Sequence, residues 1–461
     1  MKKSILLINP WIYDFAAYDF WAKPLGLLYI ASILQNYKEF NIHFIDCTDR
    51  YFPDIETKDK KDGTGKYHTE EVPIPECLRW MNFKYKRYGI PLNLFEKKLN
   101  ATVGNAYMRS LQNDKEINKV DACLITSRMT YWYPGVLKVI ELIRKFFGSI
   151  PIILGGVYPT LCKEHSQQNA KADFFIYGEG EEQIIQVLNE TLNLKLETFF
   201  NLNDLDTLPL PAFEFCYNLN HLPIITSRGC PKKCTYCASR ILFPKFRQRS
   251  PEKVAQEIYF HHKKFNTKHF AFYDDALLIN YENHFEIILD QLLKTDINCN
   301  FHTPNGLYAP SITLNLAKKM YQLGFKNLRL SLETADAEHL KSLKRDVFAE
   351  QLKESVQNLK KAGFDKSDIG IYIMLGLPEQ TEEEVIESIN FIKEIGASPK
   401  LTEYSPLPHT EEWDKAVKNA TLDITNEPLL HNNSVYHFIS RTLSPKSKHR
   451  LKKIISNETT D

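Results

Sequence analysis

Short apolar runs followed by helix-like segments recur along most of this chain, and this alternation limits the fold more than any other feature. In the N-terminal part the runs lie at 5–8, 42–45, 122–125, 152–154 and 174–176. Apolar residues at helical spacing follow the first run at 24–34 and the third at 133–147. Strand, helix and strand at these distances are typical of a doubly wound parallel sheet. We therefore predict a Rossmann-like α/β domain over residues 1–190.

Two stretches depart from this pattern. Residues 50–118 are charged and aromatic, with a turn-rich break at 62–65, and we interpret them as an insertion that carries short helices. Residues 191–221 are punctuated by Pro209 and Pro211, which predicts a linker between domains.

The alternation resumes after the linker. Strands are expected at 223–227, 268–273, 298–302, 327–333, 369–375 and 400–404, with helices between them. Ser250-Pro251 predicts a helix start, and Thr381 with Glu384 three places on predicts a capping box. Six such units predict a parallel barrel over 222–410. The remaining residues, 411–461, are expected to form a helical tail whose lysines and arginines face solvent.

The composition narrows the classes of function. A formal net charge of +1 gives no bulk field that would attract nucleic acid or anionic lipid. No window approaches the roughly 20 apolar residues of a membrane span, and the apolar run at the N-terminus is broken by Pro10, unlike a signal peptide. The cysteines outside 227–239 are scattered, as in a reducing compartment. We therefore expect a cytoplasmic protein without a membrane or nucleic-acid partner.

One short loop carries the chemistry. Cys230, Cys234 and Cys237 fall within eight positions, and Gly229 and Pro231 predict a turn there. Three thiolates on one loop can hold three corners of an iron–sulfur cluster. The fourth iron would then be free to coordinate a small molecule, as an open position on a catalytic zinc does. A zinc clip with a distant fourth ligand and unrelated core cysteines are the alternatives.

The pattern Cys-x3-Cys-x-aromatic-Cys, with Tyr236 as the aromatic residue, resembles the signature of radical S-adenosylmethionine (radical SAM) enzymes. The resemblance implies a [4Fe-4S] cluster on the three cysteines and SAM on the open iron. One electron from a donor such as flavodoxin or ferredoxin would then cleave SAM to a 5′-deoxyadenosyl radical. The resemblance also implies that the barrel is the partial (β/α)6 kind.

The strands of the predicted barrel carry polar residues on one face. In 328–333 the leucines alternate with Arg329, Ser331 and Glu333, and in 298–302 the polar set is Asn298, Asn300 and His302. Unpaired burial would cost about 1–3 kcal/mol for each group, so we predict that they line a polar cavity at the strands' carboxyl ends. A solvent-facing edge strand is the alternative.

The resemblance assigns some of these positions to SAM. Asp274 and Asp275 match the residues that contact the SAM amino group, Ser331 and Glu333 match the ribose-contacting strand, and Tyr236 matches the adenine side. Residues 375–381 resemble the family's Gly-x-Pro-x-x-Thr turn, and 406–410 a Pro-Gly-Thr loop in which His409 replaces glycine. His409 is either a surface residue or a substrate contact.

The strand ends of the N-terminal domain carry small and polar residues: Asn9, Asp46, Ser127, Gly155, Gly156, Gly178 and Glu179. Ligands of doubly wound sheets bind at such ends, and glycines let a bulky ligand approach. Together with the cysteine loop, this domain resembles that of cobalamin-binding radical SAM enzymes, which implies that Ser127, Gly155 and Gly156 surround the nucleotide tail of cobalamin.

The Asp-x-His-x-x-Gly motif that supplies a cobalt ligand in many corrinoid domains is absent from this chain. We therefore expect base-off cobalamin without a histidine ligand, covered by residues 131–133. Core packing of those aromatic residues, and a domain that only recognises substrate, remain the alternatives.

The function we predict is methyl transfer through cobalamin to an unactivated centre of a small molecule. A cobalamin-binding radical rearrangement or ring-forming reaction is the second hypothesis. A methylthiotransferase would need three clustered N-terminal cysteines, and Cys47, Cys77, Cys123 and Cys162 are dispersed. A non-enzymatic redox or cofactor sensor is the last alternative.

Overall fold

The computed structural model describes residues 2–110 and 120–456. They form two compact units, Met1–Leu219 and Asn220–Asp461, and each is described by itself.

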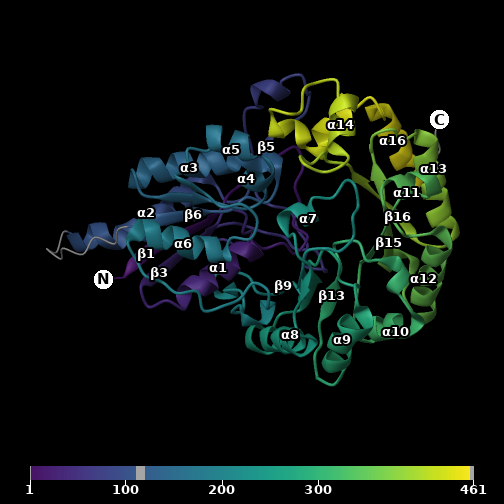
Figure 1. Cartoon of the computed structure of the whole chain (residues 1–461), viewed down its shortest axis with the longest axis horizontal. Coiled ribbons are helices and arrows are strands. Elements are labelled where there is room, and N and C mark those ends of the chain that lie inside the picture. Colours follow the sequence, from purple (N-terminus) through teal and green to yellow (C-terminus); the bar gives the residue numbers. More distant parts are fainter. Residues whose placement is uncertain (1, 111–119, 457–461) are drawn as a thin grey trace. The chain divides into compact units, whose positions relative to one another are not determined.

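The first unit contains a five-stranded parallel sheet in the order β3-β1-β6-β7-β8. Its strands are β1 (Lys3–Asn9), β3 (Phe40–Asp46), β6 (Val120–Ile125), β7 (Ile152–Leu154) and β8 (Phe174–Phe175). Figure 1 shows α1 (Leu25–Gln35) and α6 (Glu181–Leu192) on one side of the sheet, and α3 (Tyr133–Phe147), α4 (Val157–Leu161) and α5 (Lys163–Asn169) on the other. The doubly wound prediction is confirmed.

The strand order reverses between β1 and β6, which lie side by side at the centre of the sheet. Residues 5–8 of β1 are fully buried because helices cover both faces. In open α/β sheets the ligand crevice lies outside the carboxyl ends of the strands at such a reversal. The loops that begin at Asn9 and Thr126 therefore lie where a ligand of this sheet is expected to bind.

The insertion differs from the prediction. It contributes β4 (Thr69–Glu71) and β5 (Lys86–Tyr88), which join β2 (Ile12–Asp14) in a three-stranded antiparallel sheet, together with η1 (Glu76–Leu78) and α2 (Leu92–Ser110). Strands of three residues are too short to produce a recognisable alternation in the sequence. Positions 111–118 of the predicted insertion lie outside the described residues.

A buried arginine anchors the first part of the insertion. Arg50 is 3% exposed, and its guanidinium pairs with Asp19 at 2.8 Å and with Asp59 at 2.6 Å. Gly65 packs directly against it, since a Cβ there would lie 2.1 Å from Nη1.

Most of the predicted linker packs into the first unit. It contains η3 (Leu205–Thr207) and η4 (Phe213–Phe215), and Leu205 and Phe213 are buried. The amide of Ala212 donates to the carbonyl of Leu28 in α1 at 3.2 Å. Residues 205–213 are therefore anchored to this unit by buried side chains and by a backbone hydrogen bond.

The second unit contains six parallel strands. They are β9 (His221–Ile224), β12 (His269–Phe272), β13 (Asn300–His302), β14 (Leu328–Glu333), β15 (Ile369–Leu375) and β16 (Ser398–Glu403). They form the sheets β13-β12-β9 and β14-β15-β16, and single bridges join Phe301 to Phe325 and Leu307 to Leu330. The predicted open six-stranded barrel is confirmed.

Helices follow the barrel strands, as Figure 1 shows. They are α8 (Pro251–Phe265), α9 (Phe285–Leu293), α10 (Leu314–Gln322), α11 (Ala337–Ser342), α12 (Ala349–Ala362) and α13 (Glu382–Glu394). Short elements of this unit are β10 (Ser227–Arg228), α7 (Ser239–Leu242), β11 (Arg247–Gln248), η5 (Tyr281–Asn283), η6 (Ala309–Ser311) and η7 (Lys366–Asp368). In the first unit, η2 (Thr130–Trp132) directly precedes α3.

The predicted helix starts fall at the expected residues, with one change of partner. Ser250 is the N-cap residue of α8, and Thr381 Oγ1 accepts from the amide of Glu384 at the start of α13. The Glu384 carboxylate, however, accepts from Thr334 and contacts His339 Nδ1 at 2.9 Å. It joins α13 to the loop after β14, where the sequence predicted a reciprocal bond within the cap.

The C-terminal residues pack on the barrel. They form α14 (Trp413–Asn419), η8 (Pro428–His431), α15 (Asn433–Ile439) and α16 (Pro445–Ser456). Lys448 pairs with Glu403 at 2.6 Å, and Arg450 forms a bidentate pair with Glu382. Two of the five basic residues predicted to face solvent thus pair with acidic residues of β16 and α13, while Lys446, Arg450 and Lys452 are exposed as predicted. Within the described part of the chain, no helix has the length and apolar character needed to cross a membrane.

Candidate active site

The backbone fixes where the cysteine loop begins. β10 pairs antiparallel with β11, and Gly229 follows β10 with φ 80°. A Cβ at Gly229 would lie 2.7 Å from the carbonyl oxygen of Lys245. Both the left-handed conformation and this close approach require glycine.

Thr235 holds the middle of the loop. Its amide donates to the carbonyl of Leu343 at 3.2 Å, and its carbonyl accepts from the amide of Glu412 at 3.1 Å. Its hydroxyl donates to the Glu412 carboxylate at 2.9 Å. Thr235 lies between Cys234 and Tyr236, so these bonds fix both of its functional neighbours.

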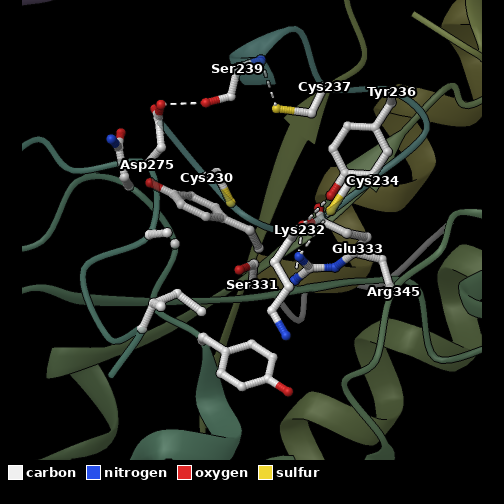
Figure 2. A pocket seen from close by; sticks show the side chains of 16 residues that line it. Cys230, Lys232, Cys234, Tyr236, Cys237, Ser239, Asp275, Ser331, Glu333 and Arg345 are labelled. Carbon is white, nitrogen blue, oxygen red and sulfur yellow. Dashed lines mark hydrogen bonds and ion pairs between the residues drawn. The ribbon is translucent and has the colours of Figure 1, made fainter. Parts of the chain in front are cut away.

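The three cysteines face one cavity of about 280 Å³, close to the lower end of the roughly 300–1,000 Å³ typical of ligand pockets. Figure 2 shows their sulfur atoms around the same space. Burial raises the pKa of the Cys230 thiol, so this thiol is protonated in the metal-free chain and releases its proton when it binds iron. No set of three or more His, Cys, Asp or Glu residues in the described chain is grouped around the position of a single ion.

Most of the residues predicted to contact SAM line this cavity. Tyr236, Asp275, Ser331 and Glu333 all contribute to its wall. The Asp275 carboxylate accepts from the Ser239 hydroxyl, and the amide of Ser239 donates to Cys237 Sγ at 3.4 Å. Asp275 and Cys237 are thereby linked through one serine (Figure 2).

Asp274 does not line the cavity. Its carboxylate accepts from the amide of Thr226 at 3.0 Å, from the Thr226 hydroxyl at 2.7 Å and from the Ser227 hydroxyl at 2.6 Å. Burial raises its pKa to about 6. These contacts tie the end of β12 to the segment after β9, so the Asp274 carboxylate has its hydrogen-bond partners within the protein.

Glu333 is held in a strained conformation at the end of β14. Its φ is 77°, and the pairing register with β15 shifts between Ser331 and Glu333. A non-glycine residue in this region costs about 1–3 kcal/mol, and such strain is concentrated at functional sites. The carboxylate accepts from the Tyr236 hydroxyl at 3.0 Å. Burial raises its pKa, and the charge of Arg345 opposes this effect.

The rest of the predicted polar set does not reach the cavity wall. His302 contacts the ring of His269 at 3.0 Å in the barrel interior. The Arg329 guanidinium donates to the carbonyl of Leu328. Asn298 and Asn300 are likewise absent from the lining residues. Alternation therefore identified the correct face of β14, but β13 contributes to the packed core.

The structure adds lining residues that the sequence analysis missed: Lys232, Ser239, Asn305, Tyr308, Arg345 and Tyr372. Lys232 and Ser239 flank the cysteines, and their position could have identified them. Asn305 donates to the carbonyls of Tyr273 and Asp274 at 3.1 Å each. Arg345 lies in a connection without periodicity, where no pattern in the sequence marks it.

The prediction for His409 left two options, and the structure places this residue in an exposed loop. Its φ of 69° lies in the left-handed region, which accounts for glycine at this position of the family loop.

At the sheet edge of the first unit, Ser127, Gly155 and Gly156 lie together. Ser127 Oγ donates to the carbonyl of Gly155 at 3.0 Å and accepts from the amide of Tyr158 at 3.0 Å. Gly156 has φ 96°, and a Cβ there would lie 2.3 Å from the carbonyl oxygen of Ser127. A Cβ at Gly155 would make only ordinary contacts, at 3.5 Å or more. The protein itself requires glycine at 156 but not at 155.

The loop after β1 contains a buried tryptophan. Trp11 is 1% exposed, and its indole donates to the carbonyl of Ile90 at 2.7 Å. A Cβ at Gly135 would lie 2.0 Å from the Trp11 carbonyl oxygen. Residues 131–133 were predicted to cover cobalamin. Of these, Tyr131 is buried, and the Trp132 indole donates to Asp14 at 2.7 Å. These two residues pack into the first unit.

Comparison with known proteins places the cysteine loop in a family. Residues 224–392 match the model of the radical SAM superfamily. This part of the chain is therefore a radical SAM domain. Its cofactors are therefore a [4Fe-4S] cluster and SAM, and the arrangement of three thiols around one cavity fits both.

Two relatives are named as methyltransferases. The chain is 24% identical over 341 residues to an uncharacterized methyltransferase of Pyrococcus horikoshii, covering 66% of this chain and 72% of the relative. It is 25% identical over 291 residues to the bacteriochlorophyllide d C-12(1)-methyltransferase of Chlorobaculum tepidum, covering 59% of this chain and 62% of that enzyme.

The fold of this radical SAM chain is also similar to a solved structure. The radical SAM methyltransferase TsrM from Kitasatospora setae, with cobalamin and a [4Fe-4S] cluster bound, matches with a TM-score of 0.64 at 12% identity. The match covers 92% of this chain and 76% of TsrM.

Replacing any one of Cys230, Cys234 and Cys237 by alanine should reduce bound iron from about four atoms per chain to less than about one. Each thiolate holds one corner of the cluster, and two do not retain it. Iron analysis of anaerobically reconstituted protein measures this, with Cys77→Ala as a control that keeps its iron. A full complement of iron in any of the three variants would contradict the assignment.

Gly156→Ala should lower the free energy of unfolding of the first unit by about 1–3 kcal/mol, because alanine is strained at φ 96° and meets the Ser127 carbonyl. Gly155→Ala is the matched control and should change it by less than about 0.5 kcal/mol. Urea unfolding followed by tryptophan fluorescence suits this test, since four of the five tryptophans lie in residues 1–219. Equal losses in both variants would show that the loop contact does not matter.

Proposed function

We propose that this radical SAM enzyme transfers a methyl group from SAM, with cobalamin as the methyl carrier, to an unactivated centre of a small molecule. The observation that carries the proposal is the shared cavity of Cys230, Cys234, Cys237, Ser331 and Glu333. The relatives named as methyltransferases favour methyl transfer over other radical reactions.

In this proposal the cavity residues divide the work of holding the cofactors. The three thiols would hold the cluster, which supplies the electron that cleaves SAM. Ser331 and Glu333 offer a hydroxyl and a carboxylate to the ribose hydroxyls, and Tyr236 covers the adenine side. Asp275 is the candidate partner of the SAM amino group. The bulged end of β14 presents Ser331 and Glu333 to one space, which pre-organises them.

We propose that the first unit binds the cobalamin through the loops of Ser127, Gly155 and Gly156. Supporting this, packing does not demand a glycine at 155, so its lack of a side chain leaves room for a ligand at the reversal of strand order. The cobalamin would be base-off without a histidine ligand, because the loop after β1, which contains the buried Trp11, has no histidine.

The other candidate functions are weaker. A methylthiotransferase needs a second cysteine cluster, and in the first unit Cys123 lies in β6, Cys47 after β3, Cys162 after α4 and Cys77 in η1. A rearrangement or ring-forming enzyme would also bind the cluster, SAM and cobalamin, but it would leave the methyl group of SAM in place. A sensor would bind the cofactors without cleaving SAM.

The partners belong to the same proposal. A one-electron donor of the flavodoxin or ferredoxin type would reduce the cluster, and the substrate would be a small molecule. We propose that the enzyme works in the cytoplasm, where the scattered cysteines, buried at 47, 123, 162, 216 and 299, remain reduced.

Products of anaerobic incubation with SAM and a strong reductant test the function. We expect both 5′-deoxyadenosine, from reductive cleavage, and S-adenosylhomocysteine, which forms only when the methyl group leaves SAM. The Cys234→Ala variant should lose the 5′-deoxyadenosine. Formation of 5′-deoxyadenosine without S-adenosylhomocysteine from cobalamin-loaded enzyme would favour the rearrangement, and formation of neither product would favour the sensor.

A further inference from the structure

Arg345 brings a guanidinium into the cavity between a cysteine and a carboxylate. It lies in the connection between α11 and α12, and its side chain is 9% exposed. Nη1 donates to Cys234 Sγ at 3.5 Å, and Nη2 lies 3.7 Å from Glu333 Oε1. Figure 2 shows Arg345 beside Cys234 and Glu333. One cation thus faces both a sulfur ligand and an acidic wall residue.

The position of Arg345 is tied to the cysteine loop through the backbone. Leu343, two residues earlier, accepts the amide of Thr235. Lys344 has φ 54°, and the amide of Arg345 donates to the carbonyl of Leu340 at 2.9 Å. The backbone that carries Arg345 is therefore held next to the cysteine loop.

The hydrogen-bonding capacity of Arg345 is largely unused by the protein. Nε and Nη2 have no hydrogen-bond partner among the described residues, although a guanidinium carries five N–H donors. Burying a charge is costly unless it is paired, and the 3.7 Å contact with Glu333 is only partial compensation. An arrangement of this kind suits a site where negative charge increases during function.

Negative charge increases at Cys234 when a cluster is reduced. Hydrogen bonds to the sulfur atoms and the net charge nearby set the potential of an iron–sulfur cluster. A guanidinium that donates to a thiolate ligand stabilises the state with one more electron, and the low dielectric of a buried site strengthens the effect. The negative charge of Glu333 would lower the reduction potential, but its carboxylate also accepts a hydrogen bond from the Tyr236 hydroxyl.

We propose that Arg345 is a positioning residue that raises the reduction potential of the cluster on Cys230, Cys234 and Cys237. A one-electron donor of the flavodoxin or ferredoxin class then reduces more of the cluster, and no bond forms or breaks in this step. The inference rests on the proposed function in one respect, the bound cluster, and requires neither cobalamin nor methyl transfer.

The test compares Arg345→Gln with the unmodified enzyme, both free of SAM and loaded with iron. Electron paramagnetic resonance of the reduced cluster, at a series of poised potentials, gives the midpoint. The expected result is an approximately tenfold smaller ratio of reduced to oxidised cluster at a fixed potential, equal to about 59 mV for a one-electron couple. Lys344→Gln is the matched control. It removes the neighbouring charge, which is 49% exposed and paired with Glu411 at 2.6 Å, so salt screens it and the midpoint should not move.

Each outcome decides the matter. An iron-loaded Arg345→Gln enzyme with an unchanged midpoint, or an equal shift in Lys344→Gln, overturns the proposal. If Arg345→Gln does not hold the cluster, Arg345→Lys replaces it. The lysine ammonium keeps the positive charge but lacks the planar, forked set of donors of a guanidinium. A smaller shift of the midpoint potential in the same direction is therefore expected. Loss of iron from both variants also overturns the proposal, because Arg345 would then build the loop. An unmodified enzyme that binds no iron refutes the proposed function itself.

Discussion

The hydrogen bonds of Thr235 place the cysteine loop, and the chemistry of the second unit depends on that placement. Three thiols can hold a cluster only if the loop that carries them keeps one geometry. Thr235 secures this geometry through Leu343, in the connection between α11 and α12, and through Glu412, after the last strand of the barrel. Gly229 fixes the entrance of the loop in a conformation that a side chain would prevent. Residues far apart in the sequence therefore define one functional loop.

The same anchors organise the groups around the loop. The connection that accepts the Thr235 amide also carries Arg345, and the strained end of β14 carries Glu333. The Tyr236 hydroxyl joins Glu333 to the loop itself. Cysteine, arginine, carboxylate and phenol thus form a connected set before any cofactor enters, which reduces the reorganisation that binding requires.

Much of this could be predicted from the sequence, because it follows from periodicity. The apolar runs that alternate with helical segments predicted the parallel strands of both units. The polar alternation in 328–333 predicted that Ser331 and Glu333 line a cavity, and both do. The failures have physical causes. Strands of three residues in the insertion carry too little pattern, and two adjacent aspartates are chemically equal in sequence although only Asp275 lines the cavity. His302 is polar but packs against His269. Arg345 depends entirely on tertiary structure.

The proposed function requires two metal cofactors in one chain, cobalamin in the first unit and the iron–sulfur cluster in the second. The decisive measurement is the cobalt and iron content, with the visible spectrum, of protein purified anaerobically after expression with added cobalamin. We predict about one cobalt and about four iron atoms per chain, with a base-off spectrum. Iron without cobalt would contradict the account, because cobalamin could then not carry the methyl group, and substrate recognition would be the alternative role of residues 1–190.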